Sequence, residues 1–559
     1  MLTGRIGLDW MIVAVLAFVG WHAPQLGTGW LIKIETYLGR FAGHRRLAIA
    51  VIFLLPILIR LSLLPLLPLQ PPYIHDEYSY LLGADTFSHG RLTNPAHPMW
   101  MFFDTFHVLQ QPTYASKYPP AQAAVLALGE LLGHPWMGVL LSMGAMCAAY
   151  LWMLQGWLPA RWALLGSILV LTRFAIFSYW MNSYWGGGVA ALGGALVMGA
   201  VPRILRKPQL RDAVVLGLGA GILANSRPLE GFILCVPVAI LILHRVVQQR
   251  GSSLRRMLLR VVLPATAVII FAASFTLYYN WRVTTDPFLF PHVLNSKTYE
   301  TVPMFVWEEL KPPRTYMNPQ FDVFYNTFER KAIPRNWEQR QYISLQKLRW
   351  SYDFFLGPAL ILPFAALWPV FASSRTRFLI LQILFCLTGA LAVIWFLPHY
   401  LAPVMATLFI ILVQALRYLR TWQSAGRSVG IGLTRAVVIS ALLMPLLPVD
   451  MNTRARFGPF AQSPGNWERE RITRDLEGTP EDHLVIVRYS RTRHNVHQEW
   501  VYNRADIDRA KIVWAREIPG MSSQPLLNYF KGRKFWLVEP EADPVQIKPY
   551  IELPSHKYE

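Results

Sequence analysis

The sequence predicts an α-helical polytopic membrane protein of about eleven to thirteen spans, with helices lying on its outer face and a small soluble α/β domain at its C-terminal end. Three observations lead to this fold class. Of the 559 residues, 53% are hydrophobic and only 15% are charged, whereas a soluble domain carries roughly 25% charged residues. Apolar runs long enough to cross a bilayer recur up to residue 448. Beyond about residue 450 the composition becomes that of a soluble protein.

The apolar runs define the candidate spans. They cover residues 7–25, 47–69, 136–156, 162–178, 186–203, 212–226, 230–245, 261–279, 354–371, 378–397, 400–418 and 429–448. Two of them, 212–226 and 230–245, fall short of the roughly 17 residues that a spanning helix needs, and others are close to that limit, so the number is approximate. The first could instead be an interfacial helix, which would leave eleven spans and a cytoplasmic start. The resulting domains are an N-terminal span and cytoplasmic loop (1–46), a transmembrane catalytic core (47–449) and an extracytoplasmic α/β domain (450–559).

Basic residues set the expected orientation. Lys and Arg exceed Asp and Glu by 20 charges, and much of the excess lies in short loops between apolar runs. The clusters are Lys33, Arg40, Arg45 and Arg46; Arg203, Arg206, Lys207 and Arg211; Arg245, Arg250, Arg255, Arg256 and Arg260; Arg375 and Arg377; and Arg417, Arg420 and Arg427. All fall on one side if the spans alternate, and the positive-inside rule makes that side cytoplasmic. Loops 70–135 and 280–353 and the C-terminal domain then lie outside, and a nucleic-acid partner is not expected.

The first outer loop contains two predicted surface helices. One runs from Asp76 to His89, because an aspartate suits a helix N-terminus and Gly90 suits the end. The other begins at Pro119-Pro120 and ends near Leu132, since proline fits a first turn. The aromatic residues between them suit an interfacial belt; they are Trp100, Phe102, Phe103, Phe106, Tyr114 and Tyr118.

Loop 280–353 and the C-terminal domain are predicted from their length and residue composition. Loop 280–353 is too polar to span, and its aromatic content indicates an ordered cover over a site. Within the C-terminal domain, residues 483–490, 511–517 and 534–540 are predicted strands, and residues 525–532 are a predicted helix.

The pair Asp76-Glu77 is the first candidate for chemistry. A hydroxyl that attacks a sugar carbon must lose its proton, and a fixed carboxylate can accept it. The alternative is a structural N-cap aspartate. The two roles are compatible, because a helix N-terminus also fixes a carboxylate and keeps it ionised.

Two cations follow. Lys117, at the start of the second surface helix, could bind a phosphate or a lipid headgroup. Arg227 interrupts an apolar stretch on the outer side, where a charge is costly unless paired. Its partner could be Glu230 or a bound phosphate.

Other outer segments give weaker signals. The aromatic residues of 178–188 could stack on a sugar or form a belt at the membrane interface. His399 and Tyr400 form an outer turn that could be structural or could contact a phosphate. The histidines near the first outer loop show no metal-ligand spacing; they are His75, His89, His97, His107 and His134.

The chain resembles the GT-C superfamily of membrane glycosyltransferases over about residues 45–450. The resemblance rests on the outward Asp76-Glu77 pair after an early span, a surface-helical loop ending in Lys117-Tyr118-Pro119-Pro120, many spans, an outer His-Tyr turn and an outer C-terminal domain. The most similar groups are the bacterial aminoarabinose transferases and the protein O-mannosyltransferases.

The resemblance implies an enzyme of the bacterial inner or plasma membrane. It would transfer a sugar from a polyprenyl-phosphate donor to a lipid, glycan or protein acceptor at the outer face, with inversion. Membrane lipids would surround it. Asp76 would be the catalytic base, and Glu77 could supply the second acid that relatives bring from a later loop, because residues 178–188 contain none.

The resemblance also implies donor-phosphate binding by Lys117, where Tyr118 is an insertion into the family's Lys-Pro-Pro pattern. Arg227, His399 and Tyr400 complete the predicted phosphate-binding set. No metal or other cofactor is required, although a divalent cation bound by the acidic pair and a histidine stays open. The alternatives are a polytopic transporter or flippase, and a non-catalytic envelope-assembly protein.

Overall fold

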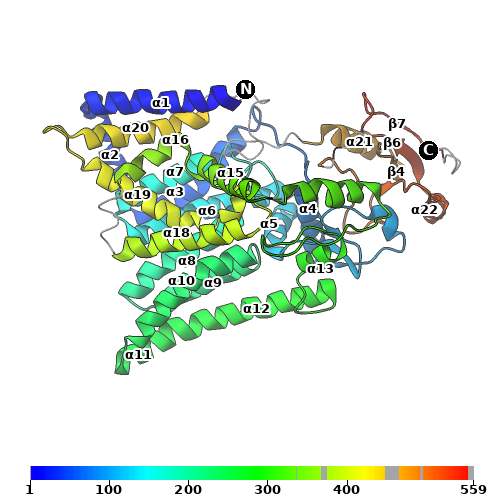
Figure 1. Ribbon diagram of the computed structural model, residues 1–559, viewed down its shortest axis with the longest axis horizontal. Coiled ribbons are helices and arrows are strands. Elements are labelled where there is room, and N and C mark those ends of the chain that lie inside the picture. The colour runs from blue at the N-terminus through cyan, green and yellow to red at the C-terminus, as the bar shows by residue number, and fades with distance from the viewer. Residues whose placement is uncertain are drawn as a thin grey trace.

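The computed structural model describes residues 2–334, 336–366, 374–446, 465–490, 495 and 497–551. This part of the chain is mostly helical and forms two regions (Figure 1). A bundle of apolar helices fills the left of the view, and the outer-loop helices with the C-terminal sheet fill the right. The predicted combination of an apolar helical body with a small C-terminal sheet domain is therefore confirmed.

Four helices in the described ranges are long and apolar enough to cross a membrane. They are α6 (Pro135–Trp157), α8 (Gly188–Arg206), α10 (Pro228–Val247) and the continuous helix Gly251–Thr284, which contains α11 (Gly251–Met257) and α12 (Leu263–Thr284). Shorter apolar helices cover Leu8–His22, Gly357–Ala366, Thr376–Ala392 and Val429–Leu443. The predicted count of eleven to thirteen spans is not confirmed, and the ends of the spans predicted at 354–371 and 429–448 lie outside the described residues.

The bundle contains nine further helices in the described ranges. They are α1 (Leu2–His22), α2 (Thr28–Gly43), α3 (Arg45–Ser62), α7 (Ala160–Phe174), α9 (Leu210–Ala224), α16 (Gly357–Ile361), α18 (Ser374–Ala392), α19 (Met405–Arg420) and α20 (Val429–Leu443). A short 3₁₀ turn, Pro398–Leu401, joins α18 to α19.

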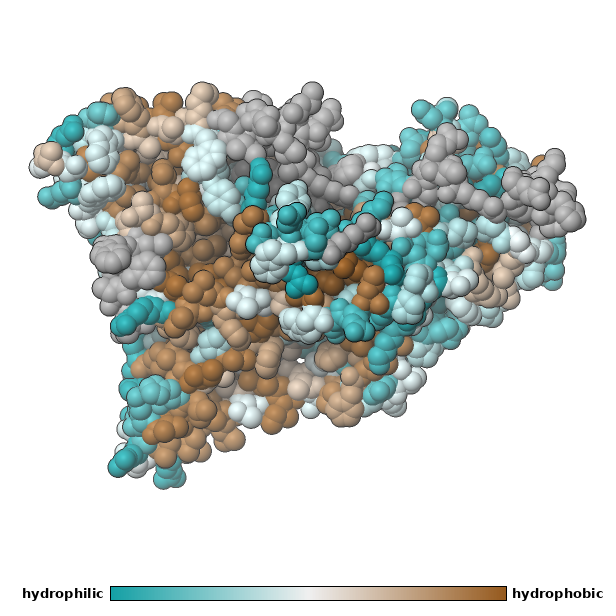
Figure 2. All heavy atoms as spheres, in the orientation of Figure 1, coloured by the Kyte–Doolittle hydropathy of each residue, from teal (hydrophilic) through white to brown (hydrophobic). Residues whose placement is uncertain are grey.

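The apolar helices differ in how much protein covers them. The central apolar stretches of α6 and α8 are each 72% buried, whereas those of α10 and of the helix Gly251–Thr284 are 17% and 11% buried. Large side chains on the uncovered faces include Phe232 and Phe271, which are 68% and 77% exposed. Figure 2 shows hydrophobic residues covering the helical part of this face. An apolar surface of this extent, on helices that satisfy their own backbone hydrogen bonds, is typical of an integral membrane protein.

The first outer loop is built on α4 (His75–Ser88) and α5 (Pro120–Leu131). Between them lies a small antiparallel sheet in the order β1-β3-β2, made of β1 (Asn94–Pro95), β2 (Val108–Leu109) and β3 (Thr113–Ser116). Both predicted surface helices are present. The N-cap of α4 is Ile74, so Asp76 is the second helical residue and the N-cap interpretation of Asp76 is wrong.

The aromatic residues of this loop do not form an interfacial belt. Phe102, Phe103, Phe106 and Tyr114 are at most 4% exposed. Phe102, Phe103 and Tyr114 pack against the C-terminal domain, and Phe106 packs against the second outer loop. The belt prediction is wrong for these four rings, because they fill the junction between residues 70–135, residues 280–353 and the C-terminal domain.

The second outer loop is ordered where described. It contains α13 (Pro291–Thr298), α14 (Pro319–Phe321), a π-helical turn at Asp322–Phe328 and the amphipathic helix α15 (Trp337–Phe355).

The C-terminal domain carries a four-stranded sheet in the order β5-β4-β6-β7, flanked by α21 (Trp467–Glu477) and α22 (Gln524–Tyr529). β4 (His483–Val487) pairs in parallel with β5 (Ile512–Arg516) and with β6 (Lys534–Val538), and β7 (Ile547–Pro549) adds an antiparallel edge. Every residue of β4 and β5 is buried, and apart from His483 and Arg516 at their ends both strands are apolar, as expected for strands covered on both faces. The three predicted strands and the predicted helix are present, and β7 was not predicted.

Candidate active site

Asp76 lies in the first turn of α4, where the unpaired backbone N–H groups of the helix favour a negative charge. Its side chain is 23% exposed, so one side of the carboxylate is open. The hydroxyl of Tyr118 donates a hydrogen bond to Oδ1. Burial raises the pKa of Asp76 above its ordinary value, while this hydrogen bond and the positive charges of Lys117 and Arg227 act in the opposite direction. Asp76 therefore combines the basicity of a desolvated carboxylate with neighbours that favour its ionised form.

His107 stands behind the Asp76–Tyr118 pair. Its Nδ1 is 3.1 Å from the Tyr118 hydroxyl and 3.7 Å from Asp76 Oδ1. Its backbone has a φ of +62°, an uncommon conformation for a residue with a side chain. The hydroxyl of Ser79 and the backbone N–H of Lys117 both donate to its carbonyl oxygen, at 2.6 and 3.2 Å. No role was predicted for His107, because it reaches the site through this turn and not through a recognisable motif.

Arg227 and Tyr400 meet from distant parts of the chain. Arg227 is the residue before α10, and its guanidinium carbon lies 4.2 Å from the centre of the Tyr400 ring. Tyr80 of α4 stacks on Tyr118 at 4.4 Å. No ion pair within 4 Å joins Arg227 to Glu230 among the described residues, but their opposite charges still interact favourably, so the structural alternative for Arg227 stays open.

Lys117 follows β3 directly. Its Nζ lies 3.3 Å from Glu300 Oε1 and 5.6 Å from the ring of Tyr118. The contact with Glu300 ties the first outer loop to the second. A phosphate that approached Lys117 would compete with this carboxylate.

Glu77 points away from the open side of the site and is only 1% exposed. One carboxylate oxygen accepts the backbone N–H groups of Tyr73 and Ile74, at 3.0 and 3.3 Å, and the other accepts that of Tyr184 at 3.2 Å. Burial raises the pKa of Glu77 to about 7. These contacts anchor the start of α4 to the segment before α8, and they position the neighbouring Asp76.

His399 is also buried, at 1% exposure. Its Nδ1 is 3.0 Å from the hydroxyl of Tyr179, and its ring meets the edge of Trp185 at 4.8 Å. The aromatic residues of 178–188 are buried in the protein core, and Trp180, at 1% exposure, packs on Phe174. They form neither an open sugar platform nor an interfacial belt.

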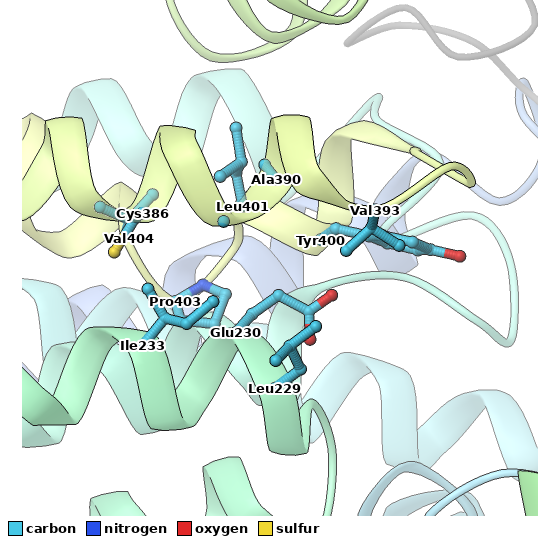
Figure 3. A pocket seen from close by; sticks show the side chains of 11 residues that line it. Leu229, Glu230, Ile233, Cys386, Ala390, Val393, Tyr400, Leu401, Pro403 and Val404 are labelled. Atoms are coloured by element: carbon cyan, nitrogen blue, oxygen red, sulfur yellow. The ribbon is translucent and has the colours of Figure 1, made fainter. Parts of the chain in front are cut away.

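A pocket opens beside Tyr400, between α10 and α18. Glu230 and Tyr400 are its polar residues, and apolar side chains line the rest (Figure 3). The pocket therefore joins an apolar wall to the residues around Arg227.

Five of these residues form one group, called here the charged cluster: Asp76, Lys117, Tyr118, Arg227 and Tyr400. Glu77 and His399 lie behind it as buried supports. Within the described residues, no group of three or more His, Cys, Asp or Glu side chains could hold a metal ion.

No family model matches the chain, and no curated protein sequence matches it. Several solved structures are similar to it, each at 13% identity. An oligosaccharyltransferase of Archaeoglobus fulgidus, tethered to an acceptor peptide, aligns with a TM-score of 0.43 over 78% of this chain and 61% of its own. The present chain thus spans about three fifths of that protein.

Two further structures contain lipid phosphates. The Archaeoglobus fulgidus oligosaccharyltransferase AglB, in complex with an inhibitory peptide and a dolichol-phosphate, aligns with a TM-score of 0.46 over 89% of this chain and 69% of its own. ArnT from Cupriavidus metallidurans, bound to undecaprenyl phosphate, aligns with a TM-score of 0.43 over 92% and 93%. These proteins are members of the GT-C superfamily, which is the superfamily that the sequence motifs resemble.

Proposed function

We propose that this chain is an integral-membrane glycosyltransferase. It moves a sugar from a polyprenyl-phosphate donor to a hydroxyl of a lipid, glycan or protein acceptor, at the outer face of the membrane. The observation that carries the proposal is the charged cluster: the carboxylate of Asp76, 23% exposed, lies close enough to Lys117 and Arg227 to feel both positive charges, and Tyr400 of the cluster lines an apolar pocket.

Asp76 is the general base of the proposed reaction. It accepts the proton of the acceptor hydroxyl as the oxygen attacks the anomeric carbon of the sugar. The bond between that carbon and the phosphate oxygen breaks, and the phosphate leaves with the electron pair. A single displacement of this kind inverts the configuration at the sugar carbon. Tyr118 keeps the carboxylate oriented, and Glu77 fixes the helical turn that carries it.

The cations act on the leaving group. Negative charge develops on the phosphate as the bond breaks, and fixed positive groups stabilise that charge in the transition state. Arg227 offers a planar fork of N–H donors that suits a phosphate, and its contact in this structure is the face of Tyr400 rather than a carboxylate. Lys117 would exchange Glu300 for the phosphate. Through Tyr179 and its position next to Tyr400, His399 supports this part of the site.

The pocket and its surroundings suit the lipid part of the donor. An isoprenoid chain is as apolar as the bilayer, so its binding site must open toward lipid. The pocket lies between α10 and α18, and α10 is largely uncovered by protein. The outer-face location follows from the basic clusters, which the positive-inside rule assigns to the cytoplasm. No nucleotide-binding loop is needed for a donor that is already a phosphate ester.

The test is transfer of labelled sugar. Purified protein in lipid vesicles is incubated with radiolabelled polyprenyl-phosphate sugars and membrane extract, and the labelled product is identified by mass spectrometry. The proposal predicts label on a new acceptor with wild-type protein and almost none with Asp76→Asn. A transporter would move the labelled donor across the vesicle with its sugar–phosphate bond intact, and that result would refute the proposal.

A further inference from the structure

Tyr502 of the C-terminal domain lies directly behind the charged cluster. Its hydroxyl oxygen is 3.0 Å from His75 Nδ1 and donates a hydrogen bond to the carbonyl oxygen of Phe106 at 3.3 Å. His75 immediately precedes Asp76, and Phe106 immediately precedes His107. The hydroxyl group of Tyr502 therefore contacts the residue before Asp76 and the residue before His107. Asp76 and His107 are the two residues that contact the hydroxyl of Tyr118.

The ring of Tyr502 is fixed as well. It stacks on Tyr78 of α4 with a centroid distance of 4.3 Å and an angle of 3°, and the residue is only 6% exposed. Arg469 of α21 donates to the backbone carbonyl of Tyr502 at 2.9 Å and lies 5.1 Å from the Tyr78 ring. The C-terminal domain thus holds Tyr502, and Tyr502 holds the first turn of α4.

Other contacts make the same junction rigid. The backbone N–H of Ala505 donates to Asp85 Oδ2 at 2.6 Å, near the other end of α4. The hydroxyl of Tyr114 donates to the carbonyl of Asn503 at 3.0 Å. Arg516, which is 1% exposed, pairs with Glu499 at 2.9 Å and donates to Asn318 of the second outer loop at 3.0 Å. The sheet domain is therefore joined to both outer loops through buried polar contacts.

We propose that the C-terminal domain is a structural part of the active site, and that Tyr502 is the residue through which it positions Asp76. The inference rests on the proposed function, in which Asp76 is the base. Tyr502 touches no reacting atom; its hydroxyl sets where His75 and Phe106 lie, and thereby the spacing of Asp76, Tyr118 and His107. A general base displaced by a fraction of an ångström loses much of its effect, because reacting atoms must approach closely and in line.

The test compares two variants that each lose one hydroxyl at the domain junction. Tyr502→Phe keeps the ring stacked on Tyr78 and removes only the contacts of its hydroxyl group, which include those to His75 and Phe106 and a hydrogen bond with Thr105. Tyr114→Phe removes a buried hydroxyl that also crosses the junction but does not reach the turn that carries Asp76. For both variants, kcat and the donor KM are measured, together with hydrogen–deuterium exchange of peptides covering residues 73–80 and 104–108.

For Tyr502→Phe we expect kcat to fall by about tenfold with an unchanged donor KM, and exchange to rise in both peptides. For Tyr114→Phe we expect neither change. The inference is overturned if the two variants behave alike, or if exchange rises in Tyr502→Phe while kcat stays at the wild-type value. Exchange does not depend on activity: if it rises only in Tyr502→Phe while wild-type protein transfers no sugar, the positioning by Tyr502 stands and the proposed function falls.

Discussion

Replacing Asp76 with asparagine removes the proposed base while changing the site very little. Asparagine has nearly the same shape, and its amide oxygen can still accept the hydrogen bond that Tyr118 donates to Asp76. The start of α4 stays anchored by Glu77, whose oxygens accept three backbone N–H groups. The variant therefore isolates the loss of proton acceptance and negative charge.

The expected loss follows from that role. General-base catalysis contributes about 10²–10⁴-fold to a rate, and each tenfold step corresponds to about 1.4 kcal/mol. Asp76→Asn should thus lower kcat by at least about 10²-fold, equivalent to about 3 kcal/mol of transition-state stabilisation. Binding of the donor should change little, because Lys117 and Arg227 remain.

The assay is initial-rate transfer from a labelled polyprenyl-phosphate sugar, with the donor Kd measured separately. Asp104→Asn is the matched control. Asp104 is also a buried outer-loop aspartate that accepts a tyrosine hydroxyl, from Tyr299 at 2.8 Å, but it lies outside the charged cluster. Its asparagine variant should keep near wild-type activity. Transfer by Asp76→Asn at the wild-type rate, or an equal loss in Asp104→Asn, would refute Asp76 as the base.

Three further predictions follow from the contacts of the site and of the domain junction. Activity needs ionised Asp76, so it should fall as the pH drops through the raised pKa of this carboxyl. Tyr118→Phe removes a hydrogen bond that lowers this pKa, so the acidic limb of the pH–rate profile should move to higher pH. An unmoved limb would argue against the hydrogen bond between Tyr118 and Asp76. Arg227→Ala should lower kcat/KM for the donor by about tenfold or more, since a hydrogen bond to a charged group contributes about 1.5–3 kcal/mol, and an unchanged kcat/KM would remove Arg227 from phosphate binding and leaving-group stabilisation. Arg516→Ala removes the guanidinium that pairs with buried Glu499 and should destabilise the C-terminal domain by about 3–5 kcal/mol. The measurement is urea unfolding followed through tryptophan fluorescence. Unfolding at the wild-type urea concentration would contradict the importance of this pair.

Local patterns in the sequence were sufficient to predict several helices and strands. The helix that carries Asp76, the proline-initiated helix α5 and the three predicted strands of the C-terminal domain each depend on residues close together in the chain. Their capping residues, prolines and apolar runs could therefore be recognised directly. The gathering of Asp76 with Lys117 and Arg227 was inferred from the expected side of the membrane, and the structure brings these charges together.

Contacts between distant segments could not be predicted in this way. His75 and Tyr502 are 427 residues apart, and no pattern around either residue indicates the other. The buried aromatic residues of the first outer loop resemble a membrane belt in sequence, because the same residue types are common at domain junctions and at lipid interfaces. The turn at His107, with its positive φ, is likewise held by contacts from Ser79 and Lys117, which no local pattern in the sequence indicates.

The central claim is that this chain breaks the bond between a sugar and a polyprenyl phosphate at Asp76. The most direct measurement is the amount of free polyprenyl phosphate, determined by mass spectrometry after purified protein is incubated with defined donors and acceptor extract. One polyprenyl phosphate per transferred sugar, an inverted anomeric carbon and background release by Asp76→Asn are predicted. Donor recovered intact with wild-type protein, for every sugar and acceptor fraction, would contradict the claim.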